Sequence, residues 1–280
     1  MKKEKIFGFL ALLRSYFSLV ASPTFALMVS FLIGLTDVRT LLLLGSFFLL
    51  ATAFLNSYNN LMDARADALT KDRFPIPLGL VTLREGLLFS IILFIAAAII
   101  ALPLYNINNL SGYVAYINLF LAFLYSAPKI RLKRFPFVKG SILVAHTLLI
   151  PFFMANLILG HNPTERLTLV IPLFLIGIGT HTIQDIGDIQ GDKVMGDKTI
   201  PIILGVKNSV AISLLMVVIS AILLTTYETP LKQVTLVLII AEIPPLLLLL
   251  IRKDAWKYVF WLCSALSAGV VASLLYGCCS

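Results

Sequence analysis

The segment NSYNNLMDARADALTKDRFPIPLG, Asn56 to Gly79, follows a long and almost purely apolar run. Within it, Asn59, Asp63 and Asp67 stand four residues apart. Residues at this spacing lie on one face of a helix, so three oxygen-bearing side chains point in the same direction. Two carboxylates held this way repel each other, and the pattern therefore predicts a site for a cation.

The composition around this segment indicates a membrane protein. Of the 280 residues, 59% are hydrophobic and only 13% are charged, and the mean hydropathy is +0.98. Soluble domains keep about a quarter of their residues charged, so that class is excluded. Apolar runs long enough to cross a bilayer as helices recur at 10–33, 41–61, 85–103, 110–127, 140–160, 167–184, 208–226, 233–251 and 256–277. The sequence predicts nine transmembrane helices.

Basic residues are distributed unequally between the two sides of this predicted topology. With the N-terminus in the cytoplasm, all but three of the 22 Lys and Arg residues fall on the cytoplasmic side, the exceptions being Arg39, Arg166 and Lys232. Because positively charged loops stay in the cytoplasm, we expect a multi-pass cell-membrane protein with its N-terminus and acidic segments cytoplasmic. The net charge of +8 then reflects a basic face beside anionic lipid, and gives no reason to expect nucleic acid.

A second acidic segment, HTIQDIGDIQGDKVMGDKTIPIILG from His181 to Gly205, repeats the first at a shift of 125 residues. The shift pairs Asn59 with Gln184, Asp63 with Asp188, Asp67 with Asp192, Asp72 with Asp197, and Arg73 with Lys198. Four predicted helices separate the copies, so both segments emerge on the same side of the membrane. We interpret Asp72 and Asp197 as caps of their loops.

The repeat predicts an all-α polytopic architecture of two four-helix repeats plus a ninth helix around a central cavity. The chain is then one integral-membrane domain, 1–280, with repeats at about 10–127 and 140–251 and acidic cytoplasmic loops at 56–84 and 181–207.

The chemistry that suits these carboxylates is that of a hard divalent ion. Mg²⁺ prefers carboxylate oxygens and completes its shell with water and substrate phosphate. The candidate metal ligands are Asn59, Asp63, Asp67, Asp185, Asp188 and Asp192. Asp185 lies one helical turn before Asp188, and its alternative role is to pair with a lysine.

Basic side chains near the acidic segments suggest that the metal brings phosphate with it. Arg73, Lys198 and Lys129 suit a diphosphate better than a bare metal ion. Tyr125 and Lys129, four apart at the end of the fourth predicted helix, can donate to an anionic leaving group. We attribute Arg131, Lys133 and Arg134, in the same loop, to membrane topology.

With these residues in this order, the sequence resembles members of the UbiA superfamily of intramembrane prenyltransferases, and the resemblance covers the whole chain. The first family motif, Asn-x3-Asp-x3-Asp, is met by Asn59, Asp63 and Asp67. The second, Asp-x3-Asp, is met by Asp188 and Asp192, and a Tyr-x3-Lys element on the fourth helix by Tyr125 and Lys129.

The resemblance implies an enzyme that holds an isoprenyl diphosphate through two bridging Mg²⁺ ions, ionises it to an allylic cation and transfers the prenyl group to a lipophilic acceptor. No obligate protein partner is expected. The catalytic residues implied are Asp63, Asp67, Asp188, Asp192, Tyr125 and Lys129. The residues implied to contact the substrate are Asn59, Arg73, Tyr125, Lys129 and Lys198.

Two departures from the family pattern bear on the acceptor. Asn60 stands where the family often has aspartate. The additional asparagine Asn56, one helical turn earlier, makes this segment similar to that of the menaquinone and vitamin K branch. The stretch GDKTIPIILG, which begins at Gly196, resembles archaeal-type members that prenylate a glycerol-phosphate lipid. The acceptor is therefore either a quinone-type aromatic or a glycerol-phosphate lipid.

Two other functions fit parts of the pattern. A cation transporter or exchanger also uses acidic repeats, but usually places them near the bilayer midplane, on broken helices within inverted repeats. The acids here lie at helix ends on one side, with bases beside them. A metal-dependent lipid diphosphate phosphatase shares the site and differs only in which bond breaks. Glu242, in the middle of the eighth predicted helix, must face protein or a cavity, where it either accepts hydrogen bonds or lines the acceptor space.

Overall fold

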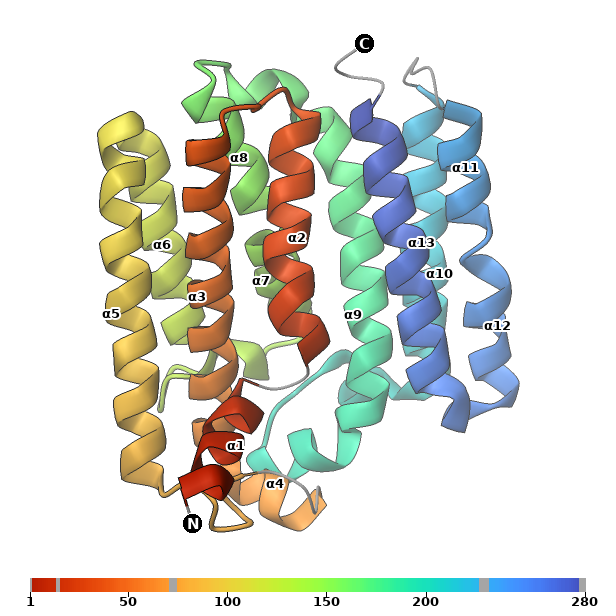
Figure 1. The fold of residues 1–280 in the computed structure, drawn as a ribbon. Helices are drawn as coiled ribbons and strands as arrows, with labels where there is room; N and C mark the ends of the chain where they lie inside the picture. Colours follow the sequence, from red (N-terminus) through yellow and green to blue (C-terminus); the bar gives the residue numbers. More distant parts are fainter. Residues whose placement is uncertain (1, 14–15, 71–74, 227–231, 277–280) are drawn as a thin grey trace.

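The computed structural model is a bundle of helices, with no strand among the residues that it describes. It describes the chain except residues 1, 14–15, 71–74, 227–231 and 277–280. The long helices run side by side along one axis (Figure 1). The prediction of an all-α membrane protein is confirmed in this coarse form.

The order of the elements follows the predicted apolar runs. The first part contains α1 (Lys2–Leu12), α2 (Tyr16–Leu32), α3 (Val38–Met62), α4 (Ala64–Thr70), α5 (Leu83–Ile107) and α6 (Asn109–Ser126). The middle contains η1 (Leu132–Arg134), α7 (Val138–Val144), the π-helical turn η2 (Ala145–Leu149), α8 (Ile150–Ile158) and η3 (Pro163–Arg166). The last part contains α9 (Leu167–Met195), α10 (Ile200–Thr225), α11 (Lys232–Ile240), α12 (Ile243–Ile251), η4 (Lys253–Ala255) and α13 (Trp256–Tyr276).

Within the described residues, six helical segments are long and apolar enough to cross a membrane. They are Val38–Met62, Leu83–Ile107, Val138–Ile158, Val170–Met195, Ile200–Thr225 and Gln233–Ile251. The number of nine spans and the four-helix repeat therefore stay predictions.

The boundaries of the acidic segments differ from those predicted. The span predicted to end at residue 184 continues as α9 to Met195, so Asp188 and Asp192 lie on a helix rather than in a loop. In the first segment α3 ends at Met62, and α4 continues the helical path after Asp63. Helix continues past the apolar run because Ile183 and Ile186 keep an apolar contact with the core on the same stretch as the acids.

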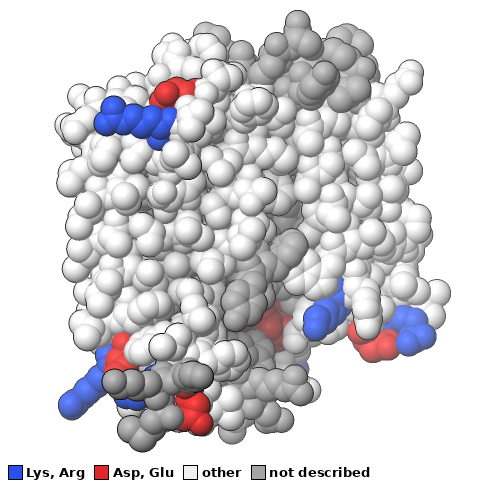
Figure 2. Space-filling view, viewed as in Figure 1, with Lys and Arg blue, Asp and Glu red and all other residues white. Residues whose placement is uncertain are grey.

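Both acidic stretches lie at one end of the bundle. In Figure 1, α4, α1 and the C-terminal end of α9 all lie at the lower end, which we call the acidic end. On the face shown in Figure 2, charged side chains gather near the two ends, and the middle is nearly free of them. This distribution suits a protein whose middle lies in hydrocarbon.

Two asparagines of α3 attach α1 to the bundle. The amide Nδ2 of Asn60 donates to the carbonyl of Leu12 at 2.7 Å, and that of Asn56 to the carbonyl of Leu13 at 3.0 Å. These carbonyls are at the C-terminal end of α1, where a helix has no internal partner for them. A carboxylate cannot donate such a bond, which explains why asparagine suits position 60 of this chain.

The attachment of α1 predicts a loss of stability in Asn60→Asp. The substitution removes a buried donor and places a negative charge against a carbonyl oxygen, so we expect a loss of about 1–3 kcal/mol and a lower Tm in detergent. Asn208→Asp is the control, since Asn208 makes the same kind of bond to Leu204, at 2.9 Å, on an exposed face. A variant Asn60→Asp as stable as the wild type, with tighter metal binding, would show that position 60 serves the metal site instead.

The unequal distribution of basic residues predicts the orientation in the membrane. In a variant with Cys263, Cys278 and Cys279 replaced by serine, a cysteine at exposed Lys193 should react with an impermeant thiol reagent only from the cytoplasmic side. A cysteine at exposed His161 should react only from outside. Labelling of both positions from the same side would exclude the predicted topology.

Candidate functional site

A cavity of about 760 Å³ opens inside the bundle, between α2, α3, α7, α9 and α13. Its charged end is lined by Asn59, Asp63, Asp67, Tyr125, Arg131, Lys133, Lys139, Gln184, Asp188 and Asp192. Its apolar part is lined by side chains that include Phe25, Leu148, Leu173, Ile176, Ala268 and Val271. Along α9, Ile176 lies about 18 Å from Asp188 at the helical rise of 1.5 Å per residue. The cavity is therefore long, with charge confined to one end.

The close packing of α13 on α9 forms one wall of this cavity. At Gly187, an added Cβ would lie within 2.3 Å of the Trp256 ring, so only glycine lets the two helices approach so closely. The start of α13 is thereby level with Asp188, and Phe260 and Trp261 line the cavity just beyond it. Side chains of a helix lean toward its N-terminus, so both aromatic rings lean toward the acidic end.

The two acidic segments meet in this cavity. Asn59, Asp63 and Asp67 line it from the end of α3 and from α4, and their repeat counterparts Gln184, Asp188 and Asp192 line it from α9. Asp63 caps α3, and the backbone N–H of Asp67 donates to its carbonyl at 2.9 Å. This i to i−4 bond continues the helical hydrogen-bond pattern from α3 into α4, which keeps Asp67 near the same face as Asp63.

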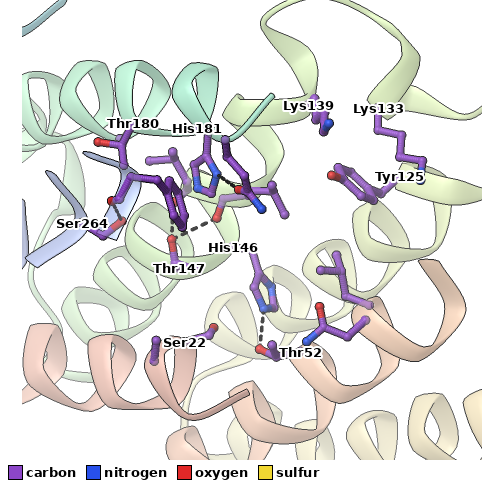
Figure 3. A pocket seen from close by; sticks show the side chains of 18 of the residues that line it. Ser22, Thr52, Tyr125, Lys133, Lys139, His146, Thr147, Thr180, His181 and Ser264 are labelled. Carbon is purple, nitrogen blue, oxygen red and sulfur yellow. Dashed lines mark hydrogen bonds between the residues drawn. The ribbon is translucent and has the colours of Figure 1, made fainter. Parts of the chain in front are cut away.

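Three basic side chains stand among the carboxylates. Lys133 donates to Asp63 and to the Asn59 side-chain oxygen, and Arg131 Nη2 donates to Asp63 Oδ1 at 2.8 Å. Lys139 Nζ lies 2.7 Å from Asp185 Oδ1 and 3.1 Å from Asp192 Oδ2. Figure 3 shows Lys133 and Lys139 grouped with Tyr125 at one end of the cavity.

These pairings decide the ionisation of Asp63 and Lys133. Burial would raise the pKa of the Asp63 carboxyl, but Lys133 and Arg131 together hold that pKa below its usual value. Burial lowers the pKa of the Lys133 ammonium to about 8, with Asp63 opposing the shift and Arg131 adding to it. Lys133 and Arg131 thus share the Asp63 carboxylate, and Arg131 also pairs with Asp197.

The donor set suits a magnesium ion, although the carboxylates are paired with bases. Carboxylate and amide oxygens that face one cavity are the ligands that Mg²⁺ prefers, and phosphate oxygens complete its shell. Within the part of the chain that the structure describes, no three His, Cys, Asp or Glu side chains are grouped as a ready-made metal site. Arg131, Lys133 and Lys139 pair with Asp63, Asp185 and Asp192, so a metal ion that bound Asp63 or Asp192 would have to displace these bases.

Asp185 differs from the other predicted ligands. It is buried, pairs with Lys139, and is not among the described residues that line the cavity. This geometry favours its alternative role as the partner of a lysine.

Two of the three predicted phosphate-binding bases lie outside the cavity lining. Lys129 and Lys198 are exposed and are not among the described residues that line the cavity, and Arg73 lies outside the described residues. Tyr125 and Lys129 would share a face on a continuous helix, but α6 ends at Ser126 and Lys129 has a φ of 72°. Tyr125 itself is buried and lines the cavity, with the Lys133 ammonium 5.8 Å from its ring centre.

Three other bases face the cavity instead. Arg131 and Lys133 were attributed to topology, yet both line the cavity, as does Lys139. Lys139 is the second residue of α7, so the helix start fixes its direction. Spacing gave no signal for Arg131 and Lys133, because the chain from residue 127 to 137 forms no regular structure longer than the three residues of η1.

His146 also lines the cavity, and the sequence gave it no role. It lies in η2, where its Nε2 is 2.8 Å from Thr52 Oγ1 (Figure 3). Its Nδ1 is 3.0 Å from Asn118 Oδ1. Pro151 explains the π-helical turn, because it lacks an N–H and its ring crowds the preceding turn. The wider turn brings His146 and Thr147, neighbours in sequence, to the same cavity.

Glu242 supports the cavity wall from behind. It is buried between α11 and α12 and accepts a hydrogen bond from Ser267 Oγ at 2.8 Å. Ser267 lines the cavity, whereas Glu242 is not among the described lining residues. Of its two predicted roles, the structure favours hydrogen bonding.

Comparison with known proteins gives a consistent result. A model of the UbiA prenyltransferase family matches residues 20–276. The digeranylgeranylglyceryl phosphate synthase of Methanoregula boonei is 32% identical over 208 residues, 74% of this chain and 71% of the relative. That of Methanothrix thermoacetophila is 30% identical over 197 residues, 70% of each chain. The match to the synthase of Thermococcus kodakarensis, 27% identical, spans 68% of this chain and 65% of that protein's length.

Solved structures share the fold over nearly the whole chain. A UbiA homolog from Archaeoglobus fulgidus bound to DMAPP and Mg²⁺ has a TM-score of 0.72 at 21% identity, covering 97% of this chain and 99% of that one. A digeranylgeranylglyceryl phosphate synthase has a TM-score of 0.68 at 24% identity, covering 98% and 99%.

The positions of the bases predict which of them bind a diphosphate. Arg131→Gln and Lys133→Gln each remove a charge-assisted hydrogen bond inside the cavity, so we expect prenyl diphosphate affinity to fall by about one to two orders of magnitude. Lys129→Gln and Lys198→Gln, both at exposed positions, should change it little. Equilibrium competition with a labelled prenyl diphosphate measures all four, and the reverse order of effects would contradict this assignment.

Proposed function

Because the chain belongs to the UbiA prenyltransferase family, we propose that it transfers the isoprenyl group of a prenyl diphosphate to a lipophilic acceptor within the membrane. The observation that carries the proposal is the division of one cavity into a charged end and a long apolar part. A prenyl diphosphate has the same division, with its charge at one end of a hydrocarbon chain. The match favours this substrate over a bare cation.

The charged end contains the groups that a diphosphate needs. We propose that Asn59, Asp63, Asp67, Asp188 and Asp192 hold two Mg²⁺ ions, with Asp185 supporting them through Lys139. Bound Mg²⁺ would neutralise the charge that develops on the departing diphosphate. When the diphosphate enters, Arg131 and Lys133 donate to its phosphate oxygens in place of Asp63. Lys139, which pairs with Asp192 of α9, also donates to the diphosphate.

The reaction that this arrangement supports is substitution at the first carbon of the prenyl chain. The carbon–oxygen bond to the diphosphate breaks, and both electrons leave with the diphosphate. An acceptor hydroxyl forms the new bond with a lone pair and passes its proton to the released diphosphate. Donors fixed on the leaving group stabilise it in the transition state, because they need no reorganisation as the bond breaks.

The apolar part of the cavity protects the allylic cation. Phe25, Leu148 and Ile176 make this part of the wall largely apolar, and the polar side chains of His146 and Thr52, which also line the cavity, bond to each other. Phe260, Trp261 and Tyr125 present aromatic rings nearer the charged end, and such rings attract a cation. Exclusion of water favours transfer to the acceptor over hydrolysis.

For the acceptor, we propose a prenylated glyceryl phosphate. The relatives reported above are named digeranylgeranylglyceryl phosphate synthases, which supports this choice. The phosphate of such an acceptor also suits an end of the cavity that already holds three basic side chains. Its hydrocarbon chain suits the membrane around the bundle.

The test is the mass of the product. Purified protein in lipid nanodiscs should convert a labelled prenyl diphosphate, Mg²⁺ and a prenylated glyceryl phosphate into a lipid heavier by one prenyl group. A product formed only with a quinone-type aromatic acceptor would replace the proposed acceptor. Release of phosphate without prenyl transfer would identify a phosphatase, and cation flux in liposomes without any product would identify a transporter.

The metal site predicts loss of activity on chelation and on removal of a ligand. Excess EDTA should abolish turnover, and Mg²⁺ should restore it. Asp63→Asn and Asp188→Asn should each lower turnover by at least about 10–100-fold, because a lost ligand weakens the metal that the neighbouring carboxylates share. Asp254→Asn, exposed and outside the cavity, is the control. Full activity in EDTA would exclude the metal-dependent reaction.

A further inference from the structure

We propose that Asp197 is a positioning residue that fixes the Arg131 guanidinium between the two acidic segments, in the orientation in which it meets the diphosphate. The inference rests on the proposed function, because that function gives Arg131 a diphosphate to bind. Asp197 follows α9, in the stretch that the sequence suggested was only a loop cap.

The contact between the two side chains has two parallel bonds. Arg131 Nε donates to Asp197 Oδ1 at 2.7 Å, and Nη2 donates to Oδ2 at 2.8 Å. Two parallel bonds fix the plane of a guanidinium, which a single bond does not. The Asp197 side chain is only 2% exposed, so water competes little for either bond.

The same guanidinium reaches the other acidic segment. Arg131 Nη2 also donates to Asp63 Oδ1 at 2.8 Å, at the end of α3. Asp63 and Arg131 line the cavity, whereas Asp197 is not among the described residues that do so. Asp197 thus holds Arg131 from behind, and the bond that a ligand can replace is the one to Asp63.

The backbone around this contact is held in an unusual conformation. Arg131 has a φ of 42°, and Lys129 and Phe137 in the same loop have φ values of 72° and 64°. Non-glycine residues keep such angles only where the surrounding contacts over-determine them. The backbone N–H of Lys198 donates to the Arg134 carbonyl at 2.8 Å, so the loop is tied to the Asp197 stretch by backbone as well.

These contacts give Arg131 a fixed and a replaceable partner. When a metal-bound diphosphate takes Asp63, the two bonds to Asp197 keep the guanidinium in place. The N–H donors of Arg131 then already face the ligand, so binding loses less side-chain conformational entropy, which is the advantage of a preorganised site. Without Asp197, Arg131 would keep its charge but lose its direction.

The chain contains a matched control for this pair. Arg252 makes the same two bonds to Asp254, at 3.1 and 2.9 Å. Both of those side chains are about two-thirds exposed, at 65% and 68%, and neither lines the cavity among the described residues. A general effect of breaking an Arg–Asp pair would therefore appear in Asp254→Asn as well.

The experiment is a double-mutant cycle on the full chain in nanodiscs. Binding of a non-transferable prenyl thiolodiphosphate with Mg²⁺ is measured for the wild type, Asp197→Asn, Arg131→Gln, the double variant and Asp254→Asn. We expect Asp197→Asn to weaken binding about tenfold, and Arg131→Gln at least as much. The double variant should bind no more weakly than Arg131→Gln alone, and Asp254→Asn should match the wild type.

Losses that multiply in the double variant, or unchanged binding in Asp197→Asn, would overturn the positioning role. Arg131→Lys covers the case in which Asp197→Asn does not fold, because lysine keeps the charge and lacks the two-bond geometry. It should lose about tenfold in affinity, and wild-type affinity in Arg131→Lys would overturn the proposal. Absence of binding by the wild type would instead overturn the proposed function.

Discussion

The acidic end of the cavity depends on the charge balance between buried carboxylates and three bases that reach them from one stretch of chain. Without Arg131, Lys133 and Lys139, the carboxylates of α3, α4 and α9 would repel one another where little water screens them. The stretch from 131 to 139 therefore has to lie across the ends of both acidic helices. That requirement brings the halves of the chain together and gives the cavity its charged end.

The same balance prepares the site for a charged ligand. Each base pairs with a carboxylate in the free protein, so a metal and a phosphate can replace both partners together. The exchange conserves the pairing, whereas a metal ion alone on Asp63 would take from Lys133 the carboxylate that it pairs with. This reasoning favours entry of the metal and the diphosphate as one unit. In the proposed function, the apolar remainder of the cavity would receive the hydrocarbon chain, and no charged side chain is among its described lining residues.

Helix geometry places this chemistry at one end of a membrane bundle. Asp63 caps the apolar helix α3, and α9 carries Asp188 and Asp192 past its hydrophobic run, so the charges emerge where the helices leave the apolar layer. Glu242 shows the other solution, in which an acidic group inside a span is buried and hydrogen-bonded by Ser267. The asparagines of α3 likewise satisfy the carbonyls of α1 at the same end.

The sequence by itself determined the helical membrane class and the acidic residues that stand at helical spacing in two segments. These follow from composition and from the helical period, which are local properties that survive folding unchanged. Only the tertiary structure decided which bases face the cavity. Helix α6 ends at Ser126, so the four-residue spacing of Tyr125 and Lys129 no longer places them on one face, and an irregular loop turns Arg131 and Lys133 inward. The direction of an irregular loop depends on contacts with residues distant in sequence, here Asp63 and Asp197, and no local pattern encodes it.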